Sequence, residues 1–152
     1  MAGRRGAAVV DPRLLRILDA NLNRAREGLR VCEDVVRLGF DDARLTRQVK
    51  QVRHRVTRTG KRLPVPWRDL LASRGAERDV GRPGGHLASQ RRRTIRTLFL
   101  VNVQRVKEAL RVLEEVSRII APSVGTSFAQ LRFQVYGIEA AFARRCAAVR
   151  DR

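Results

Sequence analysis

An internal repeat constrains the fold of this chain more than any other feature of its 152 residues. Residues 21–37 align without gaps on residues 102–118. The identical pairs are Asn21/Asn102, Arg24/Arg105, Glu27/Glu108, Leu29/Leu110, Arg30/Arg111, Val31/Val112, Glu33/Glu114, Val35/Val116 and Arg37/Arg118, and farther along Val52-Arg53 and Val56 match Leu131-Arg132 and Val135. Unrelated amphipathic helices would share leucines, but not an asparagine and paired charges at one phase. The repeat predicts an all-α fold, an antiparallel four-helix bundle of two homologous helical hairpins with pseudo-two-fold symmetry and a long central loop.

The hydrophobic pattern of residues 12–60 predicts the first hairpin. The expected boundaries are Asp11-Pro12 and Gly39 for the first helix, and Asp41 or Asp42 and Gly60 for the second. Apolar residues recur at spacings of three and four, as expected for the buried face of a packed helix. The expected core residues are Leu18, Leu22, Ala25, Leu29, Cys32 and Val36, then Leu45, Val49, Val52 and Val56.

Residues 90–149 predict the second hairpin. We expect its first helix to begin near Ser89 and end at Ala121-Pro122, and its second helix to begin near Thr126 or Ser127. The expected core residues are Phe99, Val103, Val106, Leu110 and Leu113, then Phe128, Leu131, Val135, Ile138 and Phe142. Between the hairpins, prolines and glycines break the pattern, so residues 61–89 are expected to form the long central loop.

Composition indicates one domain, which we expect to cover residues 8–150. Hydrophobic residues make up 43% of the chain, enough for a core without disulfides or metals. No run approaches the roughly 18 apolar residues of a membrane span. Met1 to Gly6 carry charge without an apolar segment behind them, so we expect no signal peptide and a cytoplasmic protein. Cys32 and Cys146 lack metal or redox spacing and are expected to be reduced thiols, with Cys32 in the core.

The charge of the chain favours anionic partners but identifies none of them. Lys and Arg total 33 against 15 Asp and Glu, a formal net charge of +18. Phosphorylated metabolites, nucleic acid and anionic lipid would all suit such a chain. Only Lys50, Lys61 and Lys107 are lysines, so the codon bias of a GC-rich genome explains the arginines equally well. Aromatic residues total 5%, which disfavours a base-stacking surface for single-stranded nucleic acid.

The repeated polar residues are expected to lie beside the core. On a helical wheel they form one stripe in each repeat, namely Asn21, Arg24, Gly28 and Val31, then Asn102, Arg105, Ala109 and Val112. Each arginine is expected to be half-buried and is followed three residues later by Glu27 or Glu108. One interpretation is a local ion pair that fixes helix register. The other is that both guanidinium groups line a central cleft and hold phosphate oxygens.

Glu33 and Glu114 also have two interpretations. Each is followed four residues later by an arginine, Arg37 or Arg118, which predicts a solvated ion pair on the helix surface. In a phosphotransferase, a carboxylate near the cleft would instead hold Mg²⁺, which prefers oxygen ligands. The helical wheel alone does not decide between these interpretations.

The central loop is a further candidate site because it combines cations with flexible backbone that can wrap phosphate. Its residues are Arg74, Arg78, Asp79, Gly81, Arg82, Gly84, Gly85 and His86. Loops of this composition are also often merely mobile. Thr59-Gly60-Lys61-Arg62 lacks the upstream glycine and the final Ser or Thr of a Walker motif, and no GxGxxG, zinc spacing or hydrolase elbow occurs. Phosphate transfer by this chain would lie outside the familiar nucleotide-binding frameworks.

The segment from Arg16 to Asp34, RILDANLNRAREGLRVCED, resembles the helical domain found N-terminal to thiamine-phosphate synthase in some bacteria. That family is regarded as a monofunctional hydroxymethylpyrimidine phosphate kinase. The resemblance covers about residues 14–142, and Asn-x-x-Arg-x-x-Glu-x-x-Arg-x-x-Glu occurs twice within it. Two places depart from the family pattern. Gly75 stands where an aspartate usually follows Arg74, and Arg91-Arg92-Arg93 replaces an acidic residue before the third helix.

The resemblance implies that ATP, with Mg²⁺, phosphorylates 4-amino-5-hydroxymethyl-2-methylpyrimidine phosphate to the diphosphate. Together the repeat and the resemblance give the candidate substrate- and phosphate-binding residues Asn21, Arg24, Glu27, Arg30, Arg74, Asp79, Gly81, Asn102, Arg105, Glu108 and Arg111. Glu33 and Glu114 are the candidate metal ligands. A separate thiamine-phosphate synthase is an expected partner because no fused synthase domain is present. The catalytic acid or base, the repeat that binds ATP and the oligomeric state, a homodimer included, stay open.

Three other functions also stay open. A basic helical nucleic-acid-binding protein would show steeply salt-dependent binding. A small all-α enzyme of the chorismate mutase type would use Arg and Glu to bind a dicarboxylate without ATP. A non-catalytic partner of the synthase would bind that enzyme and turn over nothing itself.

Overall fold

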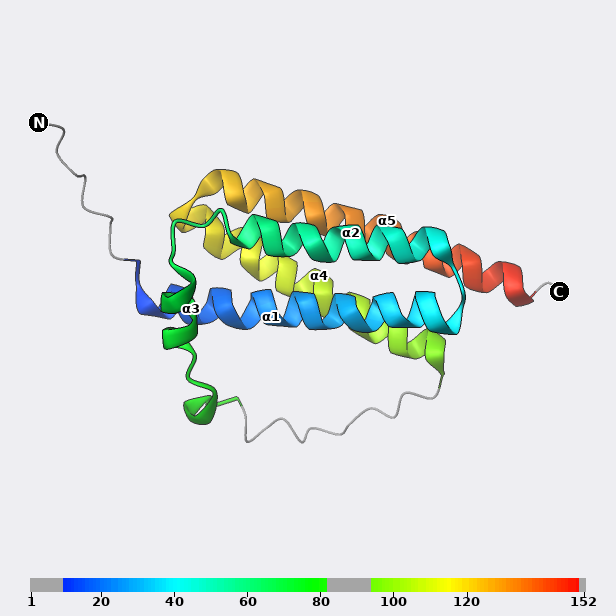
Figure 1. The fold of residues 1–152 in the computed structure, drawn as a ribbon, viewed down its shortest axis with the longest axis horizontal. Coiled ribbons are helices and arrows are strands. Elements are labelled where there is room, and N and C mark those ends of the chain that lie inside the picture. The colour runs from blue at the N-terminus through cyan, green and yellow to red at the C-terminus, as the bar shows by residue number, and fades with distance from the viewer. Residues whose placement is uncertain (1–9, 82–93, 151–152) are drawn as a thin grey trace, which may run out of the picture.

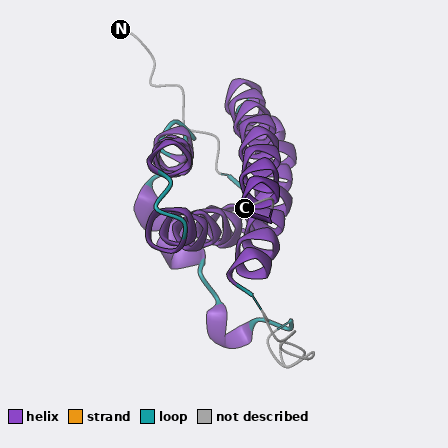
Figure 2. Cartoon of the chain, turned by 90° about the vertical axis from the view of Figure 1, so that its right-hand side faces the viewer, coloured by secondary structure: helices purple, strands orange, loops and turns teal. Residues whose placement is uncertain are grey.

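A computed structural model describes residues 10–81 and 94–150 as helices joined by short connections (Figure 1). The α-helices are α1 (Pro12–Asp34), α2 (Ala43–Gly60), α3 (Trp67–Ser73), α4 (Ile95–Ile120) and α5 (Pro122–Arg150). A π-helical turn, Val35–Gly39, continues α1 without a break, and a 3-10 turn covers Ala76–Arg78. No strand occurs within the described ranges (Figure 2), which confirms the all-α prediction. None of the described helices is long and apolar enough to cross a membrane.

The long helices pack around a common core. The most extensive interface joins α1 to α4, and α4 in turn packs on α5. Helix α2 contacts both α1 and α5, so the four long helices form a closed ring of contacts. In Figure 1, α1 and α2 run in opposite directions, as do α4 and α5, and α3 lies across the N-terminal end of α1. The superposition of the two repeats through a near two-fold axis stays a prediction.

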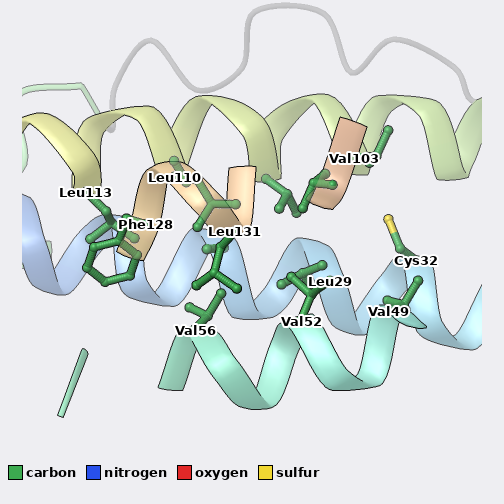
Figure 3. Close-up of a cluster of buried hydrophobic side chains, with 14 of the residues drawn as sticks. Leu29, Cys32, Val49, Val52, Val56, Val103, Leu110, Leu113, Phe128 and Leu131 are labelled. Atoms are coloured by element: carbon green, nitrogen blue, oxygen red, sulfur yellow. The ribbon is translucent and has the colours of Figure 1, made fainter. Parts of the chain in front are cut away.

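The apolar residues expected on the buried helix faces are all buried, and they meet in one core (Figure 3). Fully burying a Val, Leu or Phe side chain stabilises a fold by about 1.5–3 kcal/mol. The rings of Phe99 and Phe142 stack at a centroid distance of 3.8 Å. Cys32 is 1% exposed, and its burial raises the pKa of the thiol to about 12. The prediction that Cys32 is a core residue is therefore confirmed.

Side-chain caps fix several helix starts where the sequence predicted them. The backbone N–H of Arg13 donates to the Asp11 carboxylate at 2.8 Å, ahead of Pro12. Asp42, and not Asp41, caps α2 by accepting from the N–H of Leu45 at 2.9 Å. The predicted start of the third helix near Ser89 lies outside the described residues, whereas the predicted end at Ala121 is confirmed.

One boundary differs from the prediction. Helix α5 begins at Pro122 and not near Thr126 or Ser127, because the fixed φ of proline suits the first helical position. The π-helical turn that continues α1 ends at Gly39, as predicted, and the left-handed conformation beyond it falls on Asp41, with φ 49°. Gly39 also allows the side chain of Ile95 to pack directly against its backbone.

The predicted central loop contains a helix. Helix α3 lies within the segment expected to be irregular, and it packs on α1. Leu70 of α3 is 2% exposed, so burial of this leucine holds the short helix in place. The composition of the segment did not reveal α3 because one buried apolar residue is too little for a periodic signal.

Helices α1 and α4 approach each other closely at Gly28. A Cβ at this position would lie 2.7 Å from Cγ2 of Val106 and 3.2 Å from the carbonyl oxygen of Asn102. The matching residue in the second repeat is Ala109, which is also small and buried. The repeated motifs on α1 and α4 are therefore held side by side.

Candidate functional site

The two predicted polar stripes line a single groove between α1 and α4, which we call the repeat groove. Its volume is about 680 Å³, within the range of roughly 300–1,000 Å³ that is usual for small-molecule sites. The lining residues are Asn21, Arg24, Glu27, Gly28 and Val31 of α1, with Asn102, Arg105, Glu108, Ala109 and Val112 of α4. The helical wheel placed all of these residues except Glu27 and Glu108 in one stripe on each helix, and packing of α1 on α4 brings the two stripes together.

The two asparagines of the motif are held in the same way. The side-chain amide of Asn21 donates to the carbonyl oxygen of Ile17 at 2.9 Å, and that of Asn102 donates to Leu98 at 2.8 Å. Each bond reaches back one turn along the same helix, so it fixes the amide against its own backbone. Within the described residues, the amide oxygen and the second N–H of each asparagine form no hydrogen bond.

Arg24 and Arg105 are both exposed, contrary to the expectation of half-buried side chains. Among the described residues, neither guanidinium forms an ion pair or a hydrogen bond, so the predicted local pairs with Glu27 and Glu108 are not made there. Glu108 instead accepts a hydrogen bond from the side chain of Gln104 at 2.9 Å. The walls of the groove thus carry one solvated arginine from each repeat, which suits a ligand with phosphate groups.

A second hollow of about 700 Å³ continues the groove toward the N-terminal end of α1. Asn21, Arg24 and Glu27 line both hollows. The second one adds Arg13, Arg16, Ile17, Asp19, Ala20, Asn23, Arg74, Gly75, Ala76 and Asp79. We call this part the loop end of the groove, since the segment after α3 forms one side of it. Two of the predicted loop residues, Arg74 and Asp79, therefore join the first repeat only.

Arg74 ties the loop to α1 through Asp19. The guanidinium donates two hydrogen bonds to the Asp19 carboxylate, at 2.7 and 2.8 Å, and Asp19 is only 4% exposed. The hydrogen bond and the negative charge of Asp19 raise the pKa of Arg74 above its ordinary value. Sequence reasoning missed Asp19. The one feature of the sequence that could have indicated a buried, paired Asp19 is its position directly after the core residue Leu18.

The remaining loop candidates are spread out. Asp79 lines the groove, and its carboxylate accepts a hydrogen bond from the N–H of Gly81 at 2.9 Å. Gly81 itself is exposed and lines neither hollow. The other candidates from this segment lie outside the described residues, and they are Arg82, Gly84, Gly85, His86 and Arg91 to Arg93.

The last two charged residues of each motif, Arg30 and Glu33 in the first and Arg111 and Glu114 in the second, line neither hollow of the groove. Glu33 is 3% exposed and accepts a hydrogen bond from Arg53 of α2 at 2.7 Å. Glu114 is 2% exposed and accepts from Arg132 of α5 at 2.9 Å. The predicted pair along one helix is made in the second repeat, where Arg118 lies 2.7 Å from Glu114, but Arg37 makes no such pair with Glu33 within the described residues. Neither carboxylate is solvated, because each is buried and joined to the following helix. This contact explains why Arg53 and Arg132 match in the two repeats.

Arginines surround these two carboxylates. Arg30 lies 3.9 Å from Glu33, and Arg111 and Arg118 lie 2.9 and 2.7 Å from Glu114. Burial favours a raised pKa for Glu114, but the hydrogen bond from Arg132 and the charges of the three arginines together hold its pKa below the ordinary value. Magnesium binding at Glu33 or Glu114 stays a prediction, and it would have to displace arginine. Residues 10–81 and 94–150 contain no cluster of three or more His, Cys, Asp or Glu that would hold a metal by themselves.

Known proteins resemble this chain over most of its length. The model of the ThiD2 family matches residues 16–141. A thiamine-phosphate synthase of Synechocystis sp. is 41% identical over 128 residues, which is 83% of this chain and 35% of the relative. Thiamine-phosphate synthases of Nostoc punctiforme and Thermosynechococcus vestitus are each 39% identical, over 82% and 85% of this chain and 34% and 35% of the relatives. The chain thus spans about a third of the length of these relatives. No solved structure matches it.

Proposed function

This chain belongs to the ThiD2 family, and from that premise we propose that it is a small-molecule kinase of thiamine synthesis. In the proposed reaction, ATP phosphorylates 4-amino-5-hydroxymethyl-2-methylpyrimidine phosphate and yields the diphosphate and ADP. The names of its relatives, thiamine-phosphate synthases, support a role in the synthesis of the same vitamin. The kinase activity rests on the family resemblance and on the chemistry of the groove.

The observation that carries the proposal is the pair of arginines in the repeat groove. Arg24 and Arg105 come from opposite walls, both are exposed, and the groove is large enough for a small molecule. Phosphoryl transfer depends mainly on positioning two phosphorylated reactants and neutralising the charge between them. Two guanidinium groups facing one space supply fork-shaped donors for the phosphates of both reactants.

The proposed reaction does not require a general base. The nucleophile is an oxygen of the pyrimidine's own phosphate, whose second pKa is about 6, so it is mostly deprotonated at neutral pH. This oxygen bonds to the γ-phosphorus of ATP, the bond from that phosphorus to the bridging oxygen breaks, and ADP leaves with the electron pair.

Magnesium would be held by phosphate oxygens together with the groove carboxylates. Glu27 and Glu108 line the repeat groove, both are exposed, and their oxygens are ligands of the kind that Mg²⁺ prefers. Mg²⁺ usually keeps several waters and takes only one or two carboxylates, so either glutamate together with the phosphates would supply ligands of the kind that the ion takes. When bound, the metal would neutralise charge on the transferred phosphate.

The test is a direct assay of product with purified protein. ATP, Mg²⁺ and the pyrimidine phosphate should give equal amounts of ADP and the diphosphate, measured by ³¹P NMR. Arg24→Met and Arg105→Met should each lower kcat/KM by at least about tenfold, as expected for loss of a charged hydrogen bond. Arg47→Met, on the exposed face of α2 outside the groove, is the matched control and should keep full activity.

Two results would favour the alternative functions. If no diphosphate forms and the protein binds DNA with a steep salt dependence, the chain is a nucleic-acid-binding protein. If no diphosphate forms and the protein stimulates a separate thiamine-phosphate synthase, it is a non-catalytic partner of that enzyme. Either result would contradict the proposed kinase activity.

A further inference from the structure

A separate cavity, of about 350 Å³, shares no lining residue with the repeat groove or with its loop end. We call it the indole pocket. It is formed where α1, the C-terminal end of α2 and α3 meet. Its lining residues are Leu22, Arg26, Thr57, Gly60, Lys61, Val65, Trp67 and Leu70.

The pocket combines an apolar floor with a half-exposed indole. Leu22 and Leu70 are 4% and 2% exposed, whereas Trp67 is 50% exposed. A half-exposed tryptophan beside a cavity offers a broad flat surface against which a planar ring can stack. Gly60 lets Leu22 pack closely at the floor, because a Cβ there would lie 3.0 Å from Cδ2 of the leucine.

The charged residues of the indole pocket are both cations. Arg26 and Lys61 line the cavity, and no aspartate or glutamate does. The side chain of Asn23 accepts a hydrogen bond from Arg26 at 2.6 Å, and the Arg26 guanidinium lies 5.6 Å from the centre of the Trp67 ring. Arg26 is thereby held over the Trp67 ring, at the edge of the cavity that both residues line. A ligand with a negative charge next to an aromatic ring would satisfy both features.

From this arrangement we propose that the indole pocket binds a phosphorylated heteroaromatic compound, with the ring against Trp67 and the phosphate on Arg26 and Lys61. Its volume lies near the lower end of the usual range for small-molecule sites, which suits one ring system with its phosphate. An apolar side chain of a partner protein is a poorer occupant, because it would give Arg26 and Lys61 no anionic group to bind. The proposal does not depend on the reaction assigned to the repeat groove.

Trp67 is the one tryptophan of the chain, so its fluorescence reports directly on this pocket. The full-length protein is titrated without Mg²⁺ with AMP, with UMP and with 4-amino-5-hydroxymethyl-2-methylpyrimidine phosphate. At least one of the three should change the emission saturably. Adenosine, uridine and inorganic phosphate should each bind at least about tenfold more weakly than the phosphorylated ring, since each lacks one of the two contacts. Comparing the nucleotides with the pyrimidine phosphate identifies the source of the ligand.

Variants separate this pocket from the groove. The double substitution Arg26→Met with Lys61→Met should weaken binding at least about tenfold, while Arg24→Met with Arg105→Met should leave the fluorescence titration unchanged. Val65→Phe, which fills the cavity without removing a charge, should also abolish the response; circular dichroism checks the fold of each variant. The proposal is overturned if none of the three compounds gives a saturable change, if binding survives both pocket variants, or if the groove variant abolishes it.

Discussion

The two repeats place the same motif differently against the rest of the molecule. In the second repeat, Glu114 contacts three arginines at 2.7 to 2.9 Å, and one of them comes from α5. In the first repeat, Glu33 has a single close partner, Arg53, at 2.7 Å. The duplicated carboxylate therefore joins two helices in both halves, but the second half has the denser set of charges. This difference indicates that the second repeat depends more on its ion pairs for stability.

The first repeat differs by its contact with the central segment. Asp19 of α1 binds Arg74, and this contact forms the loop end of the groove. The alignment of Asn21 with Asn102 puts Leu100 at the position that matches Asp19, so the second repeat cannot make such a pair. The two walls of the groove therefore carry the same repeated residues, but only the end next to the first repeat has the contact with the central segment. We infer that the two reactants occupy it in one orientation.

The largest expected effect is on the buried carboxylates. Glu114→Gln leaves three arginines without their common anion and should lower the free energy of unfolding by about 3 kcal/mol, the low end for a broken buried pair because two of the arginines are half-exposed. Glu33→Gln loses one close partner and should cost about 1.5–2 kcal/mol. Urea denaturation measures both. An equal or larger loss for Glu33→Gln would contradict the difference between the repeats.

The next effect concerns ligand binding. Arg16 and Arg24 both line the loop end, so the most anionic reactant, ATP, should lie toward the first repeat. Arg24→Met should weaken calorimetric binding of ATP–Mg²⁺ by about 1.5–3 kcal/mol, and more than Arg105→Met does. The melting temperature without ligand should stay near that of the wild type, because neither arginine has an ion-pair partner among the described residues. Unchanged affinities with early melting would make both arginines structural.

A smaller effect is expected when the first repeat is made to resemble the second. Asp19→Leu introduces the residue type of Leu100 and removes both hydrogen bonds to Arg74. Because the Arg74 side chain is 44% exposed, water screens the pair and the loss of stability should be small. Trypsin should nevertheless cleave faster after Arg74 and Arg78, since the segment loses its attachment to α1. Unchanged cleavage would show that other contacts hold it.

The features that depend on the periodicity of a single helix could be predicted from the sequence. The contacts that form where two segments meet could not. The core residues and the groove stripes follow from helical periodicity, so they could be read from spacing alone. The partner of Glu33 could not, because it depends on how α1 and α2 are aligned. The pair of Asp19 and Arg74 joins positions far apart in the chain without any periodic signal. The start of α5 was missed because Ala121-Pro122 was read as a helix end and not as a helix start.

The smallest effect is on the pH dependence of stability, and it tests the charge state of Glu114. Its pKa in the folded protein is lowered from the ordinary value of 4.5, so folding favours the anionic form. A carboxylate of this kind stabilises the fold fully above its unfolded pKa, and the contribution is lost as pH falls through the folded pKa. The difference in unfolding free energy between wild type and Glu114→Gln should therefore be constant near neutral pH. It should shrink as the pH falls below about 4.5, where protonation begins to cancel the contribution. Urea denaturation of both proteins over this interval measures the change. A difference that does not shrink would mean that the three arginines do not hold Glu114 as an anion.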